Sequence, residues 1–243
     1  MRVGCYQCET VFARAPSKVM RSSRNFCSRF CFFKYKEGHP NIFPKSTANP
    51  ILEPTKELAY ILGVLKGDGS VYKINHHGRY EYLVALATSE EKFARSFSRA
   101  ISKIGLKPRE SGWKKYHKIV ANSKKFYEWY KNLNPRDIEE LLSREELVKE
   151  FVRGFYESEG HFHIYTRPHL NHTHTDRYLN MTNTDKSLIK MVEGFLVKLG
   201  FNFNFHEYQR NTDLVEYRLD IHARNAIESF LNMTSPCIKG GWA

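Results

Sequence analysis

The 243-residue sequence contains no run of 18 apolar residues, which excludes a conventional transmembrane helix. Its first ten residues lack the apolar core of a secretory signal peptide. Acidic residues are scarce relative to basic ones: 26 Asp and Glu stand against 38 Lys and Arg, a formal net charge of +12. We therefore expect an intracellular protein, in the cytoplasm or a nucleic-acid-containing organelle and not secreted. It should have no membrane partner, and a polyanion is its natural ligand.

Cysteine is rare outside the N-terminal region, where four of the five cysteines lie. They form two close pairs, Cys5-x2-Cys8 and Cys27-x3-Cys31, separated by 18 residues. In a reducing compartment such pairs are more typical of metal ligands than of disulfides, and four thiolates suit one structural, tetrahedral Zn²⁺. Two alternatives stay open: reduced cysteines in a core, or His39 in place of one ligand.

Composition divides the chain into four segments. Residues 1–38 hold the paired cysteines, and eight Arg and Lys against two Glu give this segment a net charge of +6. Residues 39–54 contain four prolines, a density that neither a helix nor a central strand accepts, so they predict an extended linker. The remainder repeats itself, with a first half at 55–144 and a second half at 145–243.

Both halves have the same predicted order of elements: helix, two strands, helix, two strands, helix. The strand pattern is clearest in the second half, where Phe203 and Phe205 alternate with Asn204 and His206. Each strand then has one core face and one polar face. The sequence therefore predicts an α+β fold of two antiparallel sheets with helices on one side, plus the small N-terminal four-cysteine zinc module.

The first helix of each half contains a glycine and ends at an acid that is followed by another glycine. Asp68 and Glu159 are 91 residues apart, and Gly63 and Gly154 each precede the acid by five residues. Glycine inside a helix costs roughly 1 kcal/mol relative to alanine, so we expect two helix backbones to approach closely there. Such packing would bring the C-terminal ends of the helices, and the two acids, together.

Two neighbouring carboxylates beside unpaired helix-end carbonyls form a hard-oxygen site suited to Mg²⁺. Gly69 and Gly160 predict left-handed ends for the two helices. A metal ion in such a site can polarise a phosphate and activate a water, which phosphodiester hydrolysis requires. Asp-Gly and Glu-Gly are also common turn sequences, but two copies at matching helix ends favour a paired-acid site.

Residues 61–69 (Ile-Leu-Gly-Val-Leu-Lys-Gly-Asp-Gly) and 152–160 (Val-Arg-Gly-Phe-Tyr-Glu-Ser-Glu-Gly) resemble the two motifs of LAGLIDADG homing endonucleases. The resemblance extends from about Thr55 to the C-terminus. It implies two pseudosymmetric αββαββα halves that form a β-saddle over DNA. Family members with both motifs in one chain act as monomers on long, asymmetric double-stranded DNA targets. Their double-strand breaks promote the mobility of an intron-type element.

The resemblance also assigns roles within the motifs. Asp68 and Glu159 hold the penultimate positions, which implies that they are the catalytic acids and bind two or more Mg²⁺ ions. The backbone carbonyls of Gly67 and Ser158 would assist as further metal ligands. Family members often carry a lysine or glutamine near the start of the second helix of each half, whereas the corresponding stretches here contain no lysine. We therefore expect the auxiliary catalytic role to fall to Asn183, Thr88 or Lys186.

The N-terminal segment resembles zinc-finger-like modules found at one end of some homing endonucleases, through Phe26-Cys27-Ser28 and Lys34-Tyr35. So short a segment has little core of its own, and bound Zn²⁺ would supply much of its folding energy. Its excess of arginine predicts that it grips DNA outside the main site.

The polar faces of the strands are the predicted DNA-contact surface. A two-stranded ribbon fits the major groove, where side chains distinguish all four base pairs, and Arg and Lys also neutralise phosphates. In the first half we expect contacts from Lys73, Asn75, His77, Arg79, Lys107, Arg109, Trp113, Lys115 and His117. In the second half we expect them from His163, Tyr165, Arg167, Arg177, Asn180, Asn204, His206, Arg210 and Arg218.

Three other functions stay open. A non-catalytic DNA-binding regulator on the same fold needs the saddle but not the acids. An RNA maturase would add an intron RNA as a partner and could coexist with cleavage. A basic zinc protein bound to ribosomal RNA would need no paired acids at matching helix ends. The presence of both Asp68 and Glu159 favours the Mg²⁺-dependent DNA endonuclease.

Overall fold

The computed structural model describes residues 1–20, 23–39, 49–76, 78–113, 115–169, 172–209 and 214–239, without the side chains of 76, 79, 113, 167–169 and 172–174. The chain divides into two compact units, Met1–Thr47 and Ala48–Ala243. Most of the expected linker, residues 40–48, lies outside the described residues. In the described part of the chain, no helix combines the length and the apolar character needed to cross a membrane.

The N-terminal unit contains two short antiparallel strands and two helices: β1 (Arg2–Gly4), β2 (Val11–Ala13), α1 (Pro16–Val19) and α2 (Arg29–Gly38). The Ser28 side chain caps α2 by accepting a hydrogen bond from the Cys31 N–H at 3.2 Å. The rings of Tyr6, Phe26 and Tyr35 contact one another, with centroids 5.3 to 6.5 Å apart. This aromatic cluster packs the unit beside its cysteines.

The second unit holds two copies of the predicted order of elements. The first copy consists of α3 (Lys56–Lys66), β3 (Ser70–His76), β4 (Arg79–Thr88), α4 (Glu91–Lys103), β5 (Arg109–Trp113), β6 (Tyr116–Asn122) and α5 (Lys124–Asn132). The second consists of α7 (Glu145–Glu159), β7 (Gly160–His169), β8 (His172–Asn183), α8 (Lys186–Lys198), β9 (Asn204–Gln209), β10 (Val215–Ile221) and α9 (Arg224–Thr234). An additional helix that was not predicted from the sequence, α6 (Pro135–Leu141), joins the two copies.

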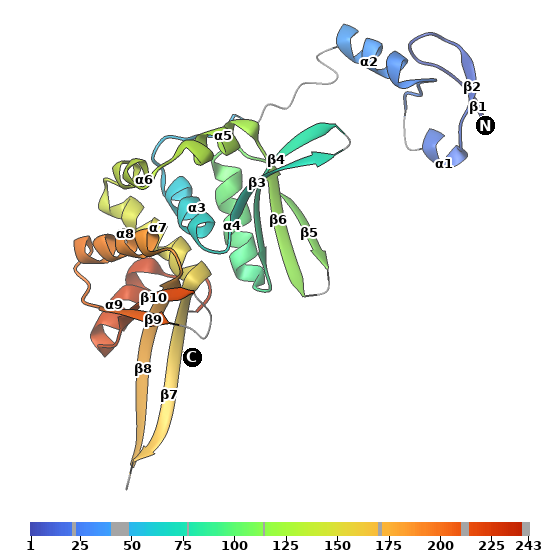
Figure 1. Ribbon diagram of the computed structural model, residues 1–243. Coiled ribbons are helices and arrows are strands. Elements are labelled where there is room, and N and C mark those ends of the chain that lie inside the picture. Colours follow the sequence, from blue (N-terminus) through green and yellow to red (C-terminus); the bar gives the residue numbers. More distant parts are fainter. Residues whose placement is uncertain are drawn as a thin grey trace. The chain divides into compact units, whose positions relative to one another are not determined.

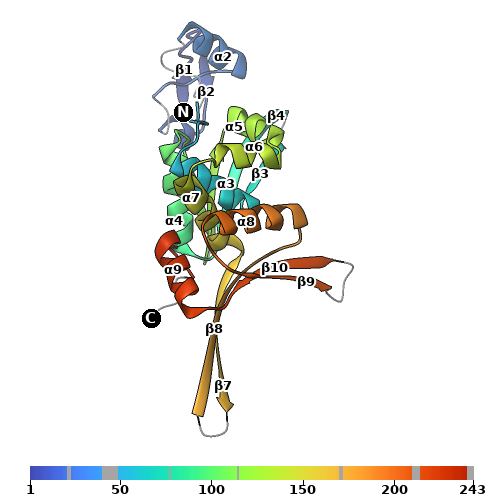
Figure 2. The ribbon, with the colours of Figure 1, turned by 90° about the vertical axis from the view of Figure 1, so that its left-hand side faces the viewer.

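Each copy forms one four-stranded antiparallel sheet, with strand order β3-β4-β6-β5 or β7-β8-β10-β9. Val84, Ile119, Leu179 and Leu219 point from the strands into a hydrophobic core that the helices share. The helices lie on this side of both sheets, and the other side of each sheet is open (Figures 1 and 2). The β7–β8 hairpin extends well beyond the helices (Figure 2). The α+β prediction of two antiparallel sheets is confirmed.

Helices α3 and α7 pack against each other between the two sheets (Figure 1). A Cβ at Gly63 would lie 2.1 Å from the Phe151 carbonyl oxygen, and a Cβ at Gly154 would lie 2.3 Å from the Tyr60 carbonyl oxygen. Contacts this short leave room for glycine alone. The two backbones therefore touch where the sequence predicted their close approach, and this contact fixes the positions of the helix ends.

Candidate active site and nucleic-acid interface

The two motif acids lie at the C-terminal ends of α3 and α7. Asp68 follows the end of α3, and Glu159 is the last residue of α7. A Cβ at Gly67 would lie 2.4 Å from Ser158 Cβ and 2.9 Å from Glu159 Cγ. The backbone next to Asp68 therefore contacts the Glu159 side chain directly, and helix packing brings the two acids together.

The proximity of the two carboxylates changes their proton affinities. Burial, followed by the negative charge of Asp68, raises the pKa of Glu159 to about 7. Burial also raises the pKa of Asp68, whereas the charges of Lys239 and His161 lower it. Both carboxylates are thus disfavoured in their charged forms in the protein alone. A divalent cation would compensate both charges, so these residues fit Mg²⁺.

The ends of the two motif helices differ from the predicted left-handed caps. Gly160 has φ −83°, and Gly69 is not among the glycines with positive φ in the described residues. Space requires glycine at these positions instead. A Cβ at Gly160 would lie 2.0 Å from Tyr156 Cδ2, and a Cβ at Gly69 would lie 2.8 Å from Leu65 Cδ2.

Lys239, in the segment after α9, lies at the end of α7. Its ammonium donates hydrogen bonds to the backbone carbonyls of Glu157 and Ser158, both at 2.8 Å. Two further hydrogen bonds hold this segment: Tyr156 Oη donates to the Lys239 carbonyl at 2.9 Å, and the Cys237 N–H donates to Glu157 Oε1 at 2.7 Å. The sequence pattern does not reveal Lys239, because this residue follows the last helix and belongs to no motif. The Ser158 carbonyl, expected to assist a metal ion, accepts from Lys239 in this structure.

The three residues expected to assist catalysis have different surroundings. Asn183 Nδ2 donates to Glu159 Oε1 at 3.2 Å. Thr88 Oγ1 accepts a hydrogen bond from the backbone N–H two residues ahead, and Lys186 Nζ donates to Glu207 Oε2 at 3.2 Å. Of the three, Asn183 is the one with a hydrogen bond to an acid of the motifs in the described structure.

Strand register decides which side chains share the open face, because directly paired residues of antiparallel strands point to the same side. In the second sheet, β10 alternates between core residues such as Leu219 and residues on the open face. Six predicted DNA-contact residues lie on that open face: His163, Tyr165, Asn180, Asn204, His206 and Arg218. Asn180 is nevertheless 4% exposed, so its neighbours cover it.

Four predicted DNA-contact residues have the opposite register and lie on the helix side of their sheets: Lys73, Asn75, His117 and Arg177. Lys73, for example, pairs with Tyr82, whose ring lies 5.1 Å from the ring of Tyr127 in α5. The expectation that these four share the open face is wrong. Their parts of the strands lie near hairpin ends or sheet edges, where both faces meet solvent and side-chain polarity does not indicate the face.

The other predicted contacts are distributed as follows. Arg109 lies on the open face of the first sheet, whereas Lys107 precedes β5 and Lys115 lies in the β5–β6 turn. Five residues lie outside the described part of the chain, wholly or by their side chains: His77, Arg79, Trp113, Arg167 and Arg210. Register also places on the open faces several residues that were not predicted as DNA contacts, among them Lys118, Tyr178, Tyr208 and Asp220.

Comparison with known proteins identifies the family. The model of the LAGLIDADG-like domain matches residues 55–134 and 146–234, more than half of the chain and both copies of the repeat. The chain belongs to the LAGLIDADG-like domain family. The resemblance expected from residues 61–69 and 152–160 is confirmed.

Individual relatives agree with this membership. An uncharacterized protein of Methanocaldococcus jannaschii, MJ0314, is 31% identical over 183 residues, and the match covers 72% of this chain but 66% of that relative, slightly less than two thirds. Mesophilic variants of the homing endonuclease I-DmoI match with a TM-score of 0.55 and 25% identity, over 74% of this chain and 96% of theirs. I-DmoI in complex with DNA and Mn matches in fold with a TM-score of 0.55 and 24% identity, over 74% and 97%.

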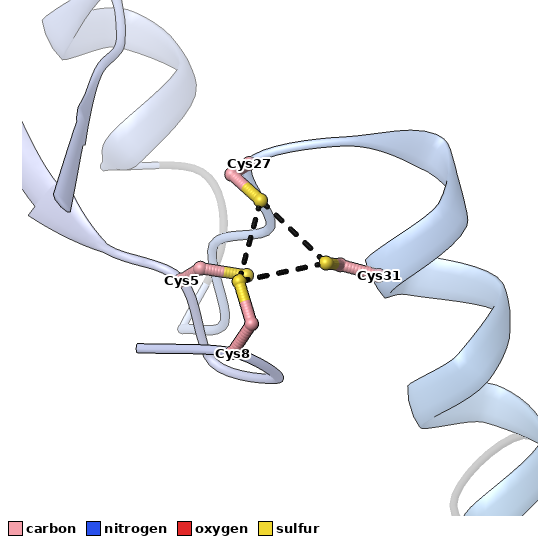
Figure 3. Close-up of side chains that lie close together, drawn as sticks. All are labelled: Cys5, Cys8, Cys27 and Cys31. Atoms are coloured by element: carbon pink, nitrogen blue, oxygen red, sulfur yellow. Dashed lines mark hydrogen bonds between the residues drawn. The ribbon is translucent and has the colours of Figure 1, made fainter. Parts of the chain in front are cut away.

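This LAGLIDADG protein also carries a cysteine cluster in its N-terminal unit, where Cys5, Cys8, Cys27 and Cys31 converge (Figure 3). The four sulfur atoms lie within 4.8 Å of one another, and three of the separations are 3.5 to 3.6 Å. Zn–S bonds of about 2.3 Å in a tetrahedron place the sulfurs about 3.8 Å apart. Hydrogen bonds of the neutral Cys27 thiol with the other cysteines, Cys31 first, raise the pKa of Cys27 to about 12. A cation would let all four thiols ionise, so the cluster is compatible with Zn²⁺.

His39 does not belong to this cluster. Its ring stacks on Tyr35 with centroids 4.0 Å apart, and its Nδ1 lies 2.9 Å from the Tyr35 carbonyl oxygen. The alternative in which His39 replaces one cysteine ligand is therefore wrong. The fifth cysteine, Cys237, is in the LAGLIDADG unit, where burial and the charge of Glu157 raise its pKa to about 12.

Proposed function

We propose that this protein is a site-specific homing endonuclease that hydrolyses phosphodiester bonds in both strands of DNA with Mg²⁺. In this proposal it acts as a monomer on a long, asymmetric target and promotes the mobility of an intron-type element. The observation that carries the proposal is the pair of acids, Asp68 and Glu159, at the ends of two packed helices between two open sheets. The net charge of +12 and the likeness to I-DmoI, solved with DNA and Mn, support DNA as the substrate.

The oxygen atoms at the helix ends suit a hard divalent cation. The carboxylates of Asp68 and Glu159 would hold the Mg²⁺ ions, two or more of them, with the carbonyl of Gly67 as a further ligand. When bound, Mg²⁺ polarises the scissile phosphate and lowers the pKa of a bound water. The Ser158 carbonyl accepts a hydrogen bond from Lys239 and would offer its remaining lone pair to a metal ion.

The protein's own groups orient and neutralise the two acids. Asn183 holds one oxygen of Glu159 through its hydrogen bond. Lys239 provides a positive charge that lowers the pKa of both acids and so favours their ionised, metal-binding forms. Asn183 and Lys239 therefore have more support as auxiliary residues than Thr88 and Lys186, which bond elsewhere.

The DNA would lie over the open faces of both sheets. The proposed contacts are the described open-face residues of the prediction other than the buried Asn180: Arg109, His163, Tyr165, Asn204, His206 and Arg218. In the proposal the N-terminal unit binds one structural Zn²⁺ through its four cysteines and grips DNA outside this site. Eight Arg and Lys in residues 1–38 support that role, because they attract phosphates regardless of sequence.

The test is a selection of duplexes from a random library in Ca²⁺, followed by incubation of the selected DNA with Mg²⁺. The proposal predicts that one consensus is enriched and that Mg²⁺ then produces cuts in both strands. A consensus without cleavage would favour a non-catalytic DNA-binding regulator on the same fold. Enrichment of an intron RNA over every duplex in a parallel selection would favour a maturase.

A further inference from the structure

An acidic side chain lies buried within the open face of the second sheet. Asp220 is 1% exposed, although strand register places it on the face of β10 opposite the core residue Leu219. β10 is an inner strand of the β7-β8-β10-β9 sheet. A buried carboxylate requires a paired charge or hydrogen bonds, and a carboxylate on a surface that receives DNA repels phosphate. The contacts of Asp220 explain why it is there.

Asp220 holds the guanidinium of Arg218 in one orientation. Arg218 donates from Nε to Oδ1 and from Nη2 to Oδ2, and both donor–acceptor distances are 2.6 Å. Two imidazoles lie on the same carboxylate, with His206 Nε2 at 3.4 Å and His222 Nε2 at 3.7 Å from Oδ2. The carboxylate is therefore enclosed by basic side chains, and its two oxygens fix the plane of the guanidinium.

Two tyrosines also restrict this guanidinium. The Cζ atom of Arg218 lies 5.7 Å from the ring centroid of Tyr178 on β8 and 5.1 Å from that of Tyr208 on β9. Both distances are within the range of cation–π attraction. Arg218 therefore has contacts from strands on both sides and from Asp220 on its own strand, although its side chain remains 24% exposed.

The outer edge of the guanidinium keeps its hydrogen-bonding capacity. An arginine has five N–H donors in a planar fork, and Asp220 takes one from Nε and one from Nη2. Within the described residues, Asp220 is the one hydrogen-bond acceptor of Arg218. The remaining donors on Nη1 and Nη2 form a parallel pair. Such a pair matches O6 and N7 of guanine in the major groove.

We infer that Arg218 reads a guanine in the major groove and that Asp220 is the residue that positions it. This inference rests on the proposed function, because it requires DNA over the second sheet. A phosphate contact fits the geometry less well. A carboxylate 2.6 Å from an arginine offsets the positive charge that phosphate binding uses, whereas base reading depends on the direction of the donors.

The test compares variants of the full chain in the duplex selection in Ca²⁺, followed by affinity measurements on single-base changes of the consensus. Arg218→Lys keeps the charge but removes the fork, and Asp220→Asn keeps the size but weakens the hold on Arg218. Lys118→Gln is the matched control, because it removes one charge from the open face of the first sheet. Circular dichroism and melting curves check that each variant is folded.

For the wild type we expect guanine at one position to be preferred over the other bases by roughly 5- to 150-fold. Arg218→Lys loses this preference at that one position, and Asp220→Asn reduces it there while nonspecific affinity stays equal or rises. Lys118→Gln lowers affinity for all sequences by a similar factor. If Asp220→Asn is unfolded, loss of the guanine preference in Arg218→Lys still supports the guanine contact of Arg218.

The inference is overturned if Arg218→Lys keeps every base preference, because Arg218 then does not read a base. It is also overturned if Arg218→Lys lowers the affinity for all sequences equally, because that result indicates a phosphate contact. That failure is distinct from failure of the proposed function. A wild type that selects a guanine-containing consensus through Arg218 but does not cut it in Mg²⁺ contradicts the endonuclease and supports the base contact.

Discussion

The Lys239 ammonium donates a 2.8 Å hydrogen bond to the carbonyl oxygen of Ser158, the residue immediately before Glu159. The same ammonium bonds the Glu157 carbonyl, so it satisfies two of the carbonyls that the end of α7 leaves without helical partners. It also places a fixed positive charge beside both motif acids. A residue outside the motifs thus contributes a positive charge that partly offsets the effect of burial on both acids.

Replacement of Lys239 should shift the pH dependence of cleavage. The charge of Lys239 lowers the pKa of Asp68 and of Glu159, so its removal raises both values. Metal binding requires the deprotonated acids, and at subsaturating Mg²⁺ the rising limb of the pH–rate profile should therefore move to higher pH in Lys239→Met. Lys239→Arg should keep the wild-type midpoint. Single-turnover cleavage across the range from mildly acidic to mildly alkaline pH measures this, and an unshifted midpoint in Lys239→Met would contradict it.

Glu159 should make the metal-free protein less stable as pH rises. Its pKa increases from an ordinary value of 4.5 to about 7 on folding. The folded state therefore holds more protons between these values, and the free energy of unfolding falls as pH rises through this window. Glu159→Gln removes the effect, so at about pH 8 without divalent ions its Tm should exceed that of the wild type by about 2 °C or more. The difference should shrink at about pH 5, and a Tm below that of the wild type under the alkaline condition contradicts the prediction.

The contact between α3 and α7 should not tolerate a methyl group. Gly63→Ala and Gly154→Ala would place a Cβ 2.1 Å and 2.3 Å from backbone oxygens of the facing helix. The helices must then separate, at a cost of about 1–3 kcal/mol or more in the free energy of unfolding. Gly194→Ala in α8 is the control, because a Cβ there meets nothing within 4 Å. Urea denaturation should show it equal to or more stable than the wild type by up to about 1 kcal/mol.

Zinc should hold the N-terminal unit together and support its contribution to DNA affinity. Cys8→Ser removes one of four converging sulfurs, so the purified protein should lose its Zn²⁺, and DNA affinity at moderate salt should fall. The LAGLIDADG unit should stay folded, because it is a separate compact unit. Metal analysis, fluorescence anisotropy and melting curves give the three readouts. Zinc loss with unchanged affinity would show that the module does not contact DNA.

The paired acids could be predicted from the sequence because the same helical motif occurs twice. Its acids, Asp68 and Glu159, are 91 residues apart and mark two equivalent helix ends. The glycines at positions 63 and 154 also have one physical explanation, close helix packing, which the structure confirms. These signals are local and occur twice. They therefore identify the family and its paired acids even though the distance between the acids depends on the tertiary structure.

The faces of the strands were less predictable. Polarity indicates the face of a strand only where one side is covered, and Ile164, paired with Arg177 on the helix side, is 54% exposed. Residues near the hairpin ends therefore carry little information about their side. The buried position of Asp220 on the open face could not be predicted either. An acidic residue in a strand pattern is expected to be exposed to solvent, whereas Asp220 is hydrogen-bonded to Arg218.

The most direct measurement for the central claim is single-turnover cleavage of the selected duplex in Mg²⁺ by Asp68→Asn and Glu159→Gln. Glu139→Gln, an exposed acid on α6, is the control. We predict that each motif variant binds the duplex in Ca²⁺ with at least about a third of wild-type affinity and cuts at least about 100-fold more slowly, since it loses metal-assisted stabilisation of the transition state. The control should cut like the wild type. Wild-type cleavage by either motif variant would contradict the account of Asp68 and Glu159 as the catalytic pair.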